Sequence, residues 1–332
     1  MNSAVKHLFI INPKSFWHSW KQDEILTRIH NLFRANEAND YEIHISRFPR
    51  DAVGFIPRFA GDLPRDTILR VYAVGGDGIL FDCLNGVMGL KNVEIAVVPY
   101  GHTNSFVRGF GGGEKVFFRN LSRQIGAPSV PMDVMRCGSN YTLNHCVIGM
   151  EAEAVRYADR MRQKMDRGNS LNQWLSRKLY TLLYFVGALA AHFDDRLNNR
   201  RYEAEIDGES VSGLFWGISV FNGAYYSGNL HPANDAVPND GVFDMLTTRG
   251  QGFFRTYGLI PFYISGRHKL FPRNFSLRRG HKLSLRCEDE EPLIISIDGM
   301  LFVETELDIE LLPAAIQLVD ASTHGYRGTA DD

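Results

Sequence analysis

The chain has 332 residues, 44% of them apolar and 22% charged, and its formal net charge is −2. This length exceeds what one hydrophobic core usually holds, so we expect two domains. A charge near zero argues against a broad nucleic-acid-binding surface. The four cysteines show no C-x-x-C spacing and the N-terminus has no long apolar segment. These features predict a cytoplasmic protein without a zinc site or a signal peptide.

The first 128 residues alternate between strand and helix patterns. Strands are predicted at 7–11, 41–46, 68–74 and 94–98, and helices at 23–35, 51–60 and 80–88. Alternating βα units form a mostly parallel sheet with helices on both faces. Ligands of such sheets bind beyond the carboxyl ends of the strands. Turns that begin near Asn12, Gly75 and Gly101 follow strands and are expected on that rim.

The turn after the strand at 68–74 consists of Gly75, Gly76, Asp77 and Gly78, and a helix pattern follows it. Glycines let the backbone approach a ligand closely, and the first N–H groups of a helix attract phosphate. A second turn lies at 97–106 with the sequence Val-Val-Pro-Tyr-Gly-His-Thr-Asn-Ser-Phe. Together the two turns predict a phosphate-binding rim.

The pattern changes near Pro128. Strands are predicted at 133–137, 141–148, 201–206, 211–219, 242–247, 283–286, 293–297 and 302–306. Turn dipeptides such as Asp207-Gly208 separate many of them, which is typical of an antiparallel β-sandwich. We therefore expect a Rossmann-like α/β domain with a parallel sheet at 1–128, followed by an antiparallel β-sandwich domain at 129–306. A helical insertion is predicted at about 151–195, and 307–325 is expected to return to the first domain.

Two segments have both a structural and a functional interpretation. The apolar stretch 179–191 is shorter than the roughly 20 residues of a membrane span and has helical spacing. We expect a buried or interface helix, with a surface that meets lipid or gates a cleft as the alternative. Basic residues at 156–167 predict a solvated helix face, or contact with anionic lipid headgroups.

Five motifs that occur in order along the chain resemble those of the diacylglycerol kinase catalytic-domain family, which includes bacterial lipid kinases and sphingosine kinases. The resemblance covers nearly the whole chain. The matching residues are the turn at 75–78 with Asn85 and Gly86, the segment Pro-x-Gly-x-x-Asn at 99–104 with Phe106, the series Asn144, Gly149 and Ala152, the series Asn222, Gly228, Pro232, Ala233, Asp240 and Gly241, and Asp298 with Gly299.

The resemblance implies that ATP and Mg²⁺ bind on the α/β domain and that a lipid binds in the cleft between the domains. The residues assigned to the nucleotide are Asn12 and Pro13 at its border, Gly75, Gly76 and Gly78 around its phosphates, and Gly101, His102, Thr103 and Asn104 as a second wall.

Three acids also receive roles from the resemblance. Asp77 would belong to the magnesium and water network. Asp298 would be the general base that accepts a proton from the substrate hydroxyl, although an Asp-Gly pair by itself is more often a hairpin turn. Asp240, with the carbonyls near Val237 and Val242, would match a structural magnesium site beside the cleft.

Several residues depart from the family's pattern. Ile79 replaces a threonine, so a hydroxyl contact with phosphate is expected to be missing. Phe16 stands where a glycine is common, and its ring is expected to crowd the nucleotide. Ser105 replaces an acid, and Met300 replaces a glutamate after Asp298-Gly299.

The main functional hypothesis is an ATP-dependent kinase that phosphorylates a hydroxyl of a lipid or lipid-like alcohol. The alternative is a non-catalytic nucleotide- or lipid-binding protein that retains the kinase fold. A dinucleotide-binding oxidoreductase is disfavoured, because no G-x-G-x-x-G opens the first helix. The expected partners are a nucleotide and a lipid, with peripheral membrane contact and without nucleic acid. The sequence leaves the acceptor, the choice of nucleotide and a homodimer open.

Overall fold

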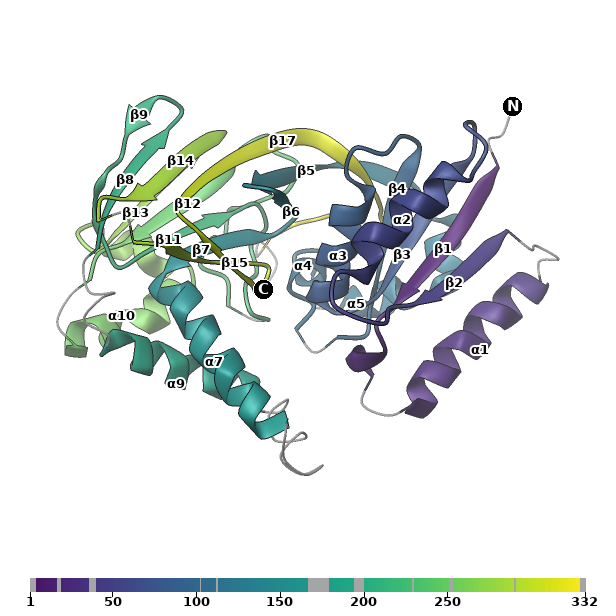
Figure 1. Ribbon diagram of the computed structural model, residues 1–332, viewed down its shortest axis with the longest axis horizontal. Coiled ribbons are helices and arrows are strands. Elements are labelled where there is room, and N and C mark those ends of the chain that lie inside the picture. The colour runs from purple at the N-terminus through teal and green to yellow at the C-terminus, as the bar shows by residue number, and fades with distance from the viewer. Residues whose placement is uncertain are drawn as a thin grey trace.

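The computed structural model describes residues 4–16, 19–35, 40–101, 103–111, 113–166, 179–193, 200–228, 230–250, 253–289 and 291–328. Its strands form an eleven-stranded sheet and a six-stranded sheet, and helices cover faces of both (Figure 1). None of the helices within these ranges is long and apolar enough to cross a membrane.

The N-terminal region contains the predicted parallel sheet. Its strands are β1 (Val5–Ile11), β2 (Tyr41–Ile45), β3 (Ile68–Gly75) and β4 (Val93–Pro99), in the spatial order β2-β1-β3-β4. The helices α2 (Asp51–Gly61) and α3 (Asp77–Val87) pack on one face, and α1 (Ser19–Ala35) packs on the other. Burial on both faces explains why these strands read as nearly continuous apolar runs.

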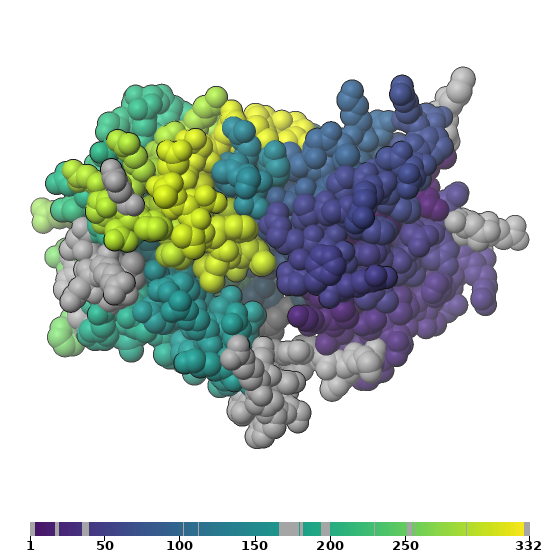
Figure 2. All heavy atoms as spheres, in the orientation of Figure 1, coloured from purple at the N-terminus to yellow at the C-terminus, as the bar shows by residue number. Residues whose placement is uncertain are grey.

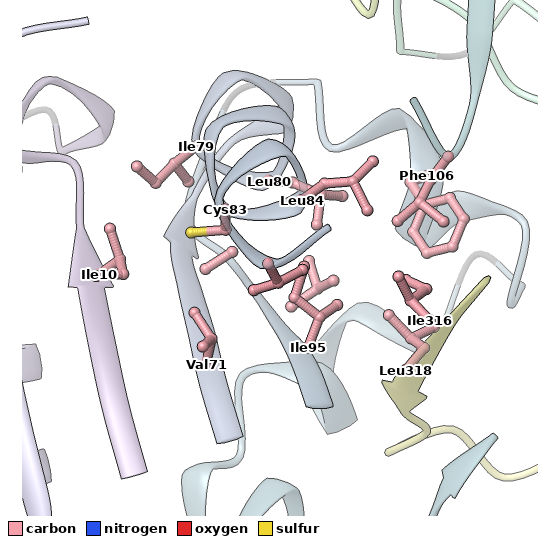
Figure 3. Close-up of a cluster of buried hydrophobic side chains, with 14 of the residues drawn as sticks. Ile10, Val71, Ile79, Leu80, Cys83, Leu84, Ile95, Phe106, Ile316 and Leu318 are labelled. Atoms are coloured by element: carbon pink, nitrogen blue, oxygen red, sulfur yellow. The ribbon is translucent and has the colours of Figure 1, made fainter. Parts of the chain in front are cut away.

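The helix α3 is held over the sheet by its apolar face. Figure 3 shows Ile79, Leu80, Cys83 and Leu84 of this helix lying over Val71 of β3 and Ile95 of β4. The same core includes Ile316 and Leu318 from the last strand, β17 (Glu306–Val319). This packing fixes the start of α3, and therefore the glycine turn, at the rim of the sheet.

The C-terminal region contains the predicted antiparallel sandwich. The six-stranded sheet runs β13-β12-β11-β7-β15-β16, and every pairing in it is antiparallel. Its strands are β7 (His145–Gly149), β11 (Gly217–Phe221), β12 (Phe243–Thr248), β13 (Phe275–Gly280), β15 (Leu293–Ile297) and β16 (Met300–Glu304). It faces strands of the larger sheet across one core.

The facing strands come from the second half of the larger sheet. They are β5 (Ser129–Cys137), β8 (Arg200–Ile206), β14 (Lys282–Cys287) and β17, while β6 (Asn140–Thr142), β9 (Glu209–Ser210) and β10 (Gly213–Phe215) are short additions. In β14, Leu283, Leu285 and Cys287 are buried and the residues between them are exposed. This alternation is typical of a strand with one face on the core.

The strand β17 connects the two regions. It pairs antiparallel with β14 and β5, and near its end Gln317 lies opposite Glu94 in a parallel pairing with β4. A register shift between Leu312 and Ile316 bends the strand, as β-bulges do. The larger sheet is therefore continuous through both regions. Figure 2 shows the yellow C-terminal residues lying against the blue residues of the N-terminal region.

Three helices cover the outer face of the six-stranded sheet. They are α7 (Met150–Asp166), α9 (Tyr180–His192) and α10 (Phe253–Ile264), and they lie beneath that sheet in Figure 1. The first two lie between β7 and β8 in the chain. The helix α10 was not predicted, because Gly258 and Pro261 weaken its intrinsic helix propensity. Packing of Leu259 into the core beneath the sheet stabilises it instead.

The expectation that 179–191 is a buried helix is correct for one face of α9 only. On the inner face, Gly187 lies against α7, where an added Cβ would come within 2.4 Å of the Ala154 carbonyl oxygen. On the outer face, Leu182 keeps 54% of its surface exposed. Short helices complete the fold at α4 (Ser105–Arg108), α5 (Lys115–Phe118) and α6 (Leu121–Gly126).

The close contact at Gly187 gives a prediction about stability. Gly187→Ala should lower the free energy of unfolding by about 1–3 kcal/mol, because the new methyl group overlaps the backbone of α7. Gly258→Ala is the matched control, since an added Cβ there meets no atom within 4 Å and alanine favours the helix. Urea denaturation of both variants checks the difference. Equal stability of the two variants would contradict this packing.

Candidate active site

A cleft of about 420 Å³ opens where the carboxyl ends of the parallel strands face the sandwich. Both regions of the chain contribute to its walls. The residues that line the cleft include Lys14, Ser15, Gly76, Asp77, Gly78, Gly101, Thr103, Ser105, Leu143, His145, Val155, Asp159, Tyr226, Asp298 and Met300. The structure therefore brings residues near both ends of the sequence into one site.

The two glycine turns of the rim are in direct contact. A Cβ on Gly101 would lie 2.2 Å from the Cα of Gly76, so only glycine fits there. The N–H groups of Tyr100 and Gly101 both donate to the carbonyl of Gly75, at 2.8 and 2.9 Å. At Gly78 an added Cβ would meet no atom within 4 Å, which leaves the start of α3 open to the cleft.

Asn104 fixes the shape of the second turn. Its amide nitrogen donates to the Gly101 carbonyl at 2.6 Å, and its amide oxygen accepts the Gly101 N–H at 3.1 Å. Its backbone is left-handed, with φ of 48°, a conformation that asparagine tolerates better than most residues. The predicted contribution of His102 to this wall lies outside the described residues.

The first predicted turn contributes to the cleft through the residues that follow it. The side-chain oxygen of Asn12 accepts the N–H of Lys14 at 3.0 Å, and Pro13 begins a short 3₁₀ turn. This turn directs Lys14 and Ser15 to the cleft wall, beside Gly76. A cationic side chain next to the start of a helix is suited to an anionic ligand.

Asp77 ties the two turns together through its carboxylate. The Thr103 hydroxyl donates to Oδ2 at 2.5 Å, and the Ser105 backbone N–H donates to Oδ1 at 2.8 Å. The Ser105 hydroxyl also donates to Oδ2 at 3.2 Å and accepts the N–H of Gly228 at 3.0 Å. An acid in place of Ser105 would bring a second carboxylate to Asp77, so the serine suits this network.

Asp298 lies in the two-residue turn between β15 and β16, where Ile297 pairs with Met300. Both turn residues have positive φ, 48° for Asp298 and 83° for Gly299, as a type I′ hairpin requires. The Thr142 hydroxyl donates to Oδ2 of Asp298 at 2.5 Å, and the His145 N–H donates to Oδ1 at 3.1 Å. The hairpin therefore presents an oriented carboxylate to the cleft.

Burial controls the protonation of the groups around this carboxylate. It raises the pKa of Asp298 to about 7, with the nearby Asp77 contributing in the same direction, although the bonds from Thr142 and His145 oppose the shift. Burial also raises the pKa of Asp77. The pKa of His145 falls to about 3 for the same reason, so this imidazole is neutral at physiological pH. A carboxyl group with a pKa near 7 can accept a proton at neutral pH.

The residues that depart from the family's pattern do not all reach the cleft. Phe16 is buried and its ring lies 5.4 Å from that of Tyr100, within the core beside α1, so the expectation that it crowds the cleft is wrong. The side chain of Ile79 also points into a core, beneath α3. Met300 does line the cleft, next to Asp298.

The predicted magnesium loop at 237–242 uses several of its polar atoms in hydrogen bonds within the loop and to Asp133. The Val237 carbonyl accepts the N–H groups of Asn239 and Asp240, at 2.8 and 3.3 Å. The Asp240 carboxylate accepts the N–H of Val242 at 3.2 Å. Within the described part of the chain, no group of three or more His, Cys, Asp or Glu residues could hold a metal ion. The magnesium site at Asp240 stays a prediction.

Sequence reasoning missed the residues that orient Asp298. Thr142 and His145 lie on either side of Asn144, which belongs to the motif with Gly149 and Ala152. They are more than 150 positions from Asp298 in the sequence, so no local pattern indicates the contact. Asp159 was also missed. It lines the cleft from α7 and pairs with Arg162, at 3.2 Å between the carboxylate and the guanidinium group.

Comparisons with known proteins match each region of the chain to a family model. Residues 6–137 match the family model of the diacylglycerol kinase catalytic domain, and residues 146–320 match that of the YegS C-terminal NAD kinase beta sandwich-like domain. A Staphylococcus aureus (strain Newman) protein named "Putative lipid kinase" is 25% identical over 255 residues, which are 75% of this chain and 76% of that protein.

Solved structures share the fold. The structure described as a putative diacylglycerol kinase from Bacillus anthracis str. Sterne superimposes with a TM-score of 0.68 at 20% identity, covering 96% of each chain. A second diacylglycerol kinase structure from the same organism gives a TM-score of 0.62 at 18% identity, covering 95% of this chain and 96% of the other.

Asp298 should make the stability of the protein depend on pH. Its pKa is about 7 in the folded state and 3.8 in the reference state, so from about pH 4 to 7 the folded protein keeps a proton that the unfolded chain has lost. The free energy of unfolding should fall across this window by up to about 1.4 kcal/mol per pH unit from this group.

Asp298→Asn cannot ionise, so it should gain stability relative to the wild type as pH rises through that window. Asparagine also tolerates the positive φ of the turn. Urea denaturation of both proteins at several pH values measures the effect. A constant difference in free energy between them across the window would mean that the pKa of Asp298 is not raised.

Proposed function

This chain belongs to the diacylglycerol kinase catalytic-domain family, and we propose that it is an ATP-dependent kinase that phosphorylates a hydroxyl of a lipid or lipid-like alcohol. The observation that carries the proposal is the position of Asp298. A largely buried carboxyl group with a pKa of about 7 opens into the same cleft as the glycine turn at the start of α3. Phosphoryl transfer to an alcohol needs a phosphate-binding site and a proton acceptor in one place.

The nucleotide end of the cleft fits phosphate groups. Gly76 and Gly78 expose backbone at the N-terminus of α3, where the first N–H groups have no partner inside the helix. Lys14 adds a positive charge to the same wall. The hydrogen bonds between the two turns hold these groups in position, and they involve Gly75, Gly101, Thr103 and Asn104.

Magnesium fits this end as an ion that arrives with the nucleotide. Mg²⁺ prefers oxygen ligands and keeps several waters, so a single cleft-lining carboxylate suits it. We assign this place in the magnesium and water network to Asp77, whose carboxylate also holds the two turns together. The bound ion would neutralise charge on the phosphates during transfer.

The acceptor end of the cleft combines a base with apolar walls. Asp298 accepts the hydroxyl proton as the alcohol oxygen forms its bond to the γ-phosphorus, and the bond to the leaving ADP breaks. Thr142 and the His145 N–H hold the carboxylate in place throughout. Leu143, Val155 and Met300 line the same space, which favours an acceptor with an apolar portion.

Asp298→Asn should lower kcat by about 100-fold or more, because general-base catalysis contributes at least that much. Nucleotide affinity should change little, since the nucleotide end does not include this residue. Steady-state kinetics and calorimetric ATP titration measure the two effects. Asp308→Asn, which alters an exposed carboxylate on β17 that bonds Ser284, is the matched control and should keep full activity. Full activity of Asp298→Asn would remove the base assignment.

The pH dependence of kcat/KM should report Asp298. Activity should rise with pH through an apparent pKa of about 7, because only the ionised carboxylate accepts a proton. Thr142→Val removes a hydrogen bond that favours the ionised form, so its acid limb should lie at higher pH. Thr27→Val, on α1, should leave the profile unchanged. An unshifted limb in Thr142→Val would show that this hydroxyl does not tune the base.

One observation favours the non-catalytic alternative. Met300 lines the cleft next to Asp298, at a position where the resemblance to the family implies a glutamate, so the site would have one carboxylate fewer. A protein that only binds nucleotide or lipid should show calorimetric ATP binding but no magnesium-dependent ATP consumption with any alcohol. ATP consumption that depends on both Mg²⁺ and a lipid alcohol would exclude this alternative.

A further inference from the structure

The helices beneath the six-stranded sheet carry a concentration of exposed apolar side chains. Among the described residues, thirteen large apolar side chains are exposed, and six of them lie on α9, on its two flanking residues or at the start of α10. We call these six the apolar surface: Leu179, Leu182, Val186, Leu189, Phe193 and Phe254. Soluble proteins usually scatter such residues, so a cluster of this kind marks an interaction site.

The α9 part of the apolar surface is one continuous stripe. Leu182, Val186, Leu189 and Phe193 follow each other at intervals of four, three and four residues, which places them on one side of a helix. Their exposed fractions are 54%, 43%, 38% and 70%. The opposite side of α9 is buried through Tyr184, Ala188 and Ala191. The stripe is therefore the outer face of a helix whose inner face is already used.

A further exposed apolar side chain, Phe254, lies at the start of α10. It is 89% exposed and lies one turn before Tyr257, on the same side of the helix. The Tyr257 hydroxyl donates to the Ala188 carbonyl of α9 at 3.3 Å, and its ring lies 5.4 Å from that of His192. The first turns of α10 therefore lie beside the flank of α9 that carries Ala188 and His192.

Basic residues gather next to Phe254. The sequence from 245 to 287 contains nine Lys and Arg residues and no Asp or Glu, and five of the nine pair with acids elsewhere in the fold. The Arg249 N–H donates to the Asn274 carbonyl at 2.9 Å, and the Arg255 guanidinium donates to the Asn274 side chain at 3.4 Å. Arg273 precedes Asn274 in the chain. These three exposed arginines form no salt bridge within the described part of the chain.

We propose that the apolar surface and these three arginines dock the protein on an anionic phospholipid bilayer. An apolar helix face with no charge of its own, beside a cluster of arginines, is the pattern of an interfacial membrane contact. A second copy of this chain fits less well, because a symmetric contact would bring the two arginine clusters toward each other. Docking goes beyond the proposed kinase activity and does not require it.

The position of the apolar surface also relates it to the cleft. The helix α7 packs against α9 at Gly187, and its other residues Val155 and Asp159 line the cleft. A bilayer bound at α9 therefore lies one helix away from the acceptor end.

Vesicle co-sedimentation of the full chain tests the proposal. The wild type should bind vesicles of mixed phosphatidylcholine and phosphatidylglycerol more tightly than vesicles of phosphatidylcholine alone. The double variant Leu182→Glu, Phe254→Glu should lose about tenfold in binding, because both side chains would enter the apolar part of the interface. The matched control is Phe48→Glu, Leu214→Glu, which alters side chains of 61% and 49% exposure elsewhere and should bind normally.

Changing Arg249, Arg255 and Arg273 to glutamine should weaken binding to the mixed vesicles and reduce the dependence of binding on salt.

Three results would overturn the proposal: no binding by the wild type, equal loss of binding in the test and control variants, or an apolar surface that instead holds a dimer. Sedimentation equilibrium of the wild type and the double variant reveals that dimer. Thermal melting shows whether each variant is folded. An inactive protein that still binds vesicles would refute the proposed kinase activity but not the docking surface.

Discussion

The carboxylate of Asp77 is the interaction on which the arrangement of the cleft depends. It receives hydrogen bonds from Thr103 and Ser105, which belong to the second turn, and Ser105 in turn accepts one from Gly228 of the C-terminal region. The half-buried carboxylate of Asp77 thereby links the glycine turn at 75–78, the turn at 97–106 and the sandwich. The close contact between Gly76 and Gly101 adds a steric constraint to the same point.

The opposite wall depends on the hairpin that carries Asp298 and Gly299. The Asp-Gly sequence is what a type I′ turn requires, and Asp298 and Gly299 adopt positive φ as that turn demands. The same geometry turns the Asp298 carboxylate toward Thr142 and His145, where burial raises its pKa. The structural interpretation of this dipeptide as a hairpin turn is therefore correct, and the role of Asp298 as a base stays a prediction. The long strand β17 keeps the two walls together by continuing the sheet from one region into the other.

The sequence indicated the fold because its local patterns are strong. The parallel strands are apolar throughout, the sandwich strands alternate, and glycine turns follow β3 and β4. Prediction failed where the outcome depends on distant packing. The ring of Phe16 turns into a core formed with Tyr100, and α10 forms although Gly258 and Pro261 disfavour it. The contact of Thr142 with Asp298 joins two strands far apart in the chain, so no local pattern could reveal it.

The central claim is that the glycine turns and Asp298 act together on one phosphoryl group. The most direct measurement is a single-turnover reaction with ATP labelled at the γ-phosphate, Mg²⁺, and diacylglycerol or another long-chain alcohol in mixed micelles, followed by separation of lipid from nucleotide. The account predicts that the label moves to the hydroxyl of a lipid alcohol and that ADP forms in equal amount. Label that stays in ATP, or that appears only as inorganic phosphate with every alcohol tried, would contradict it.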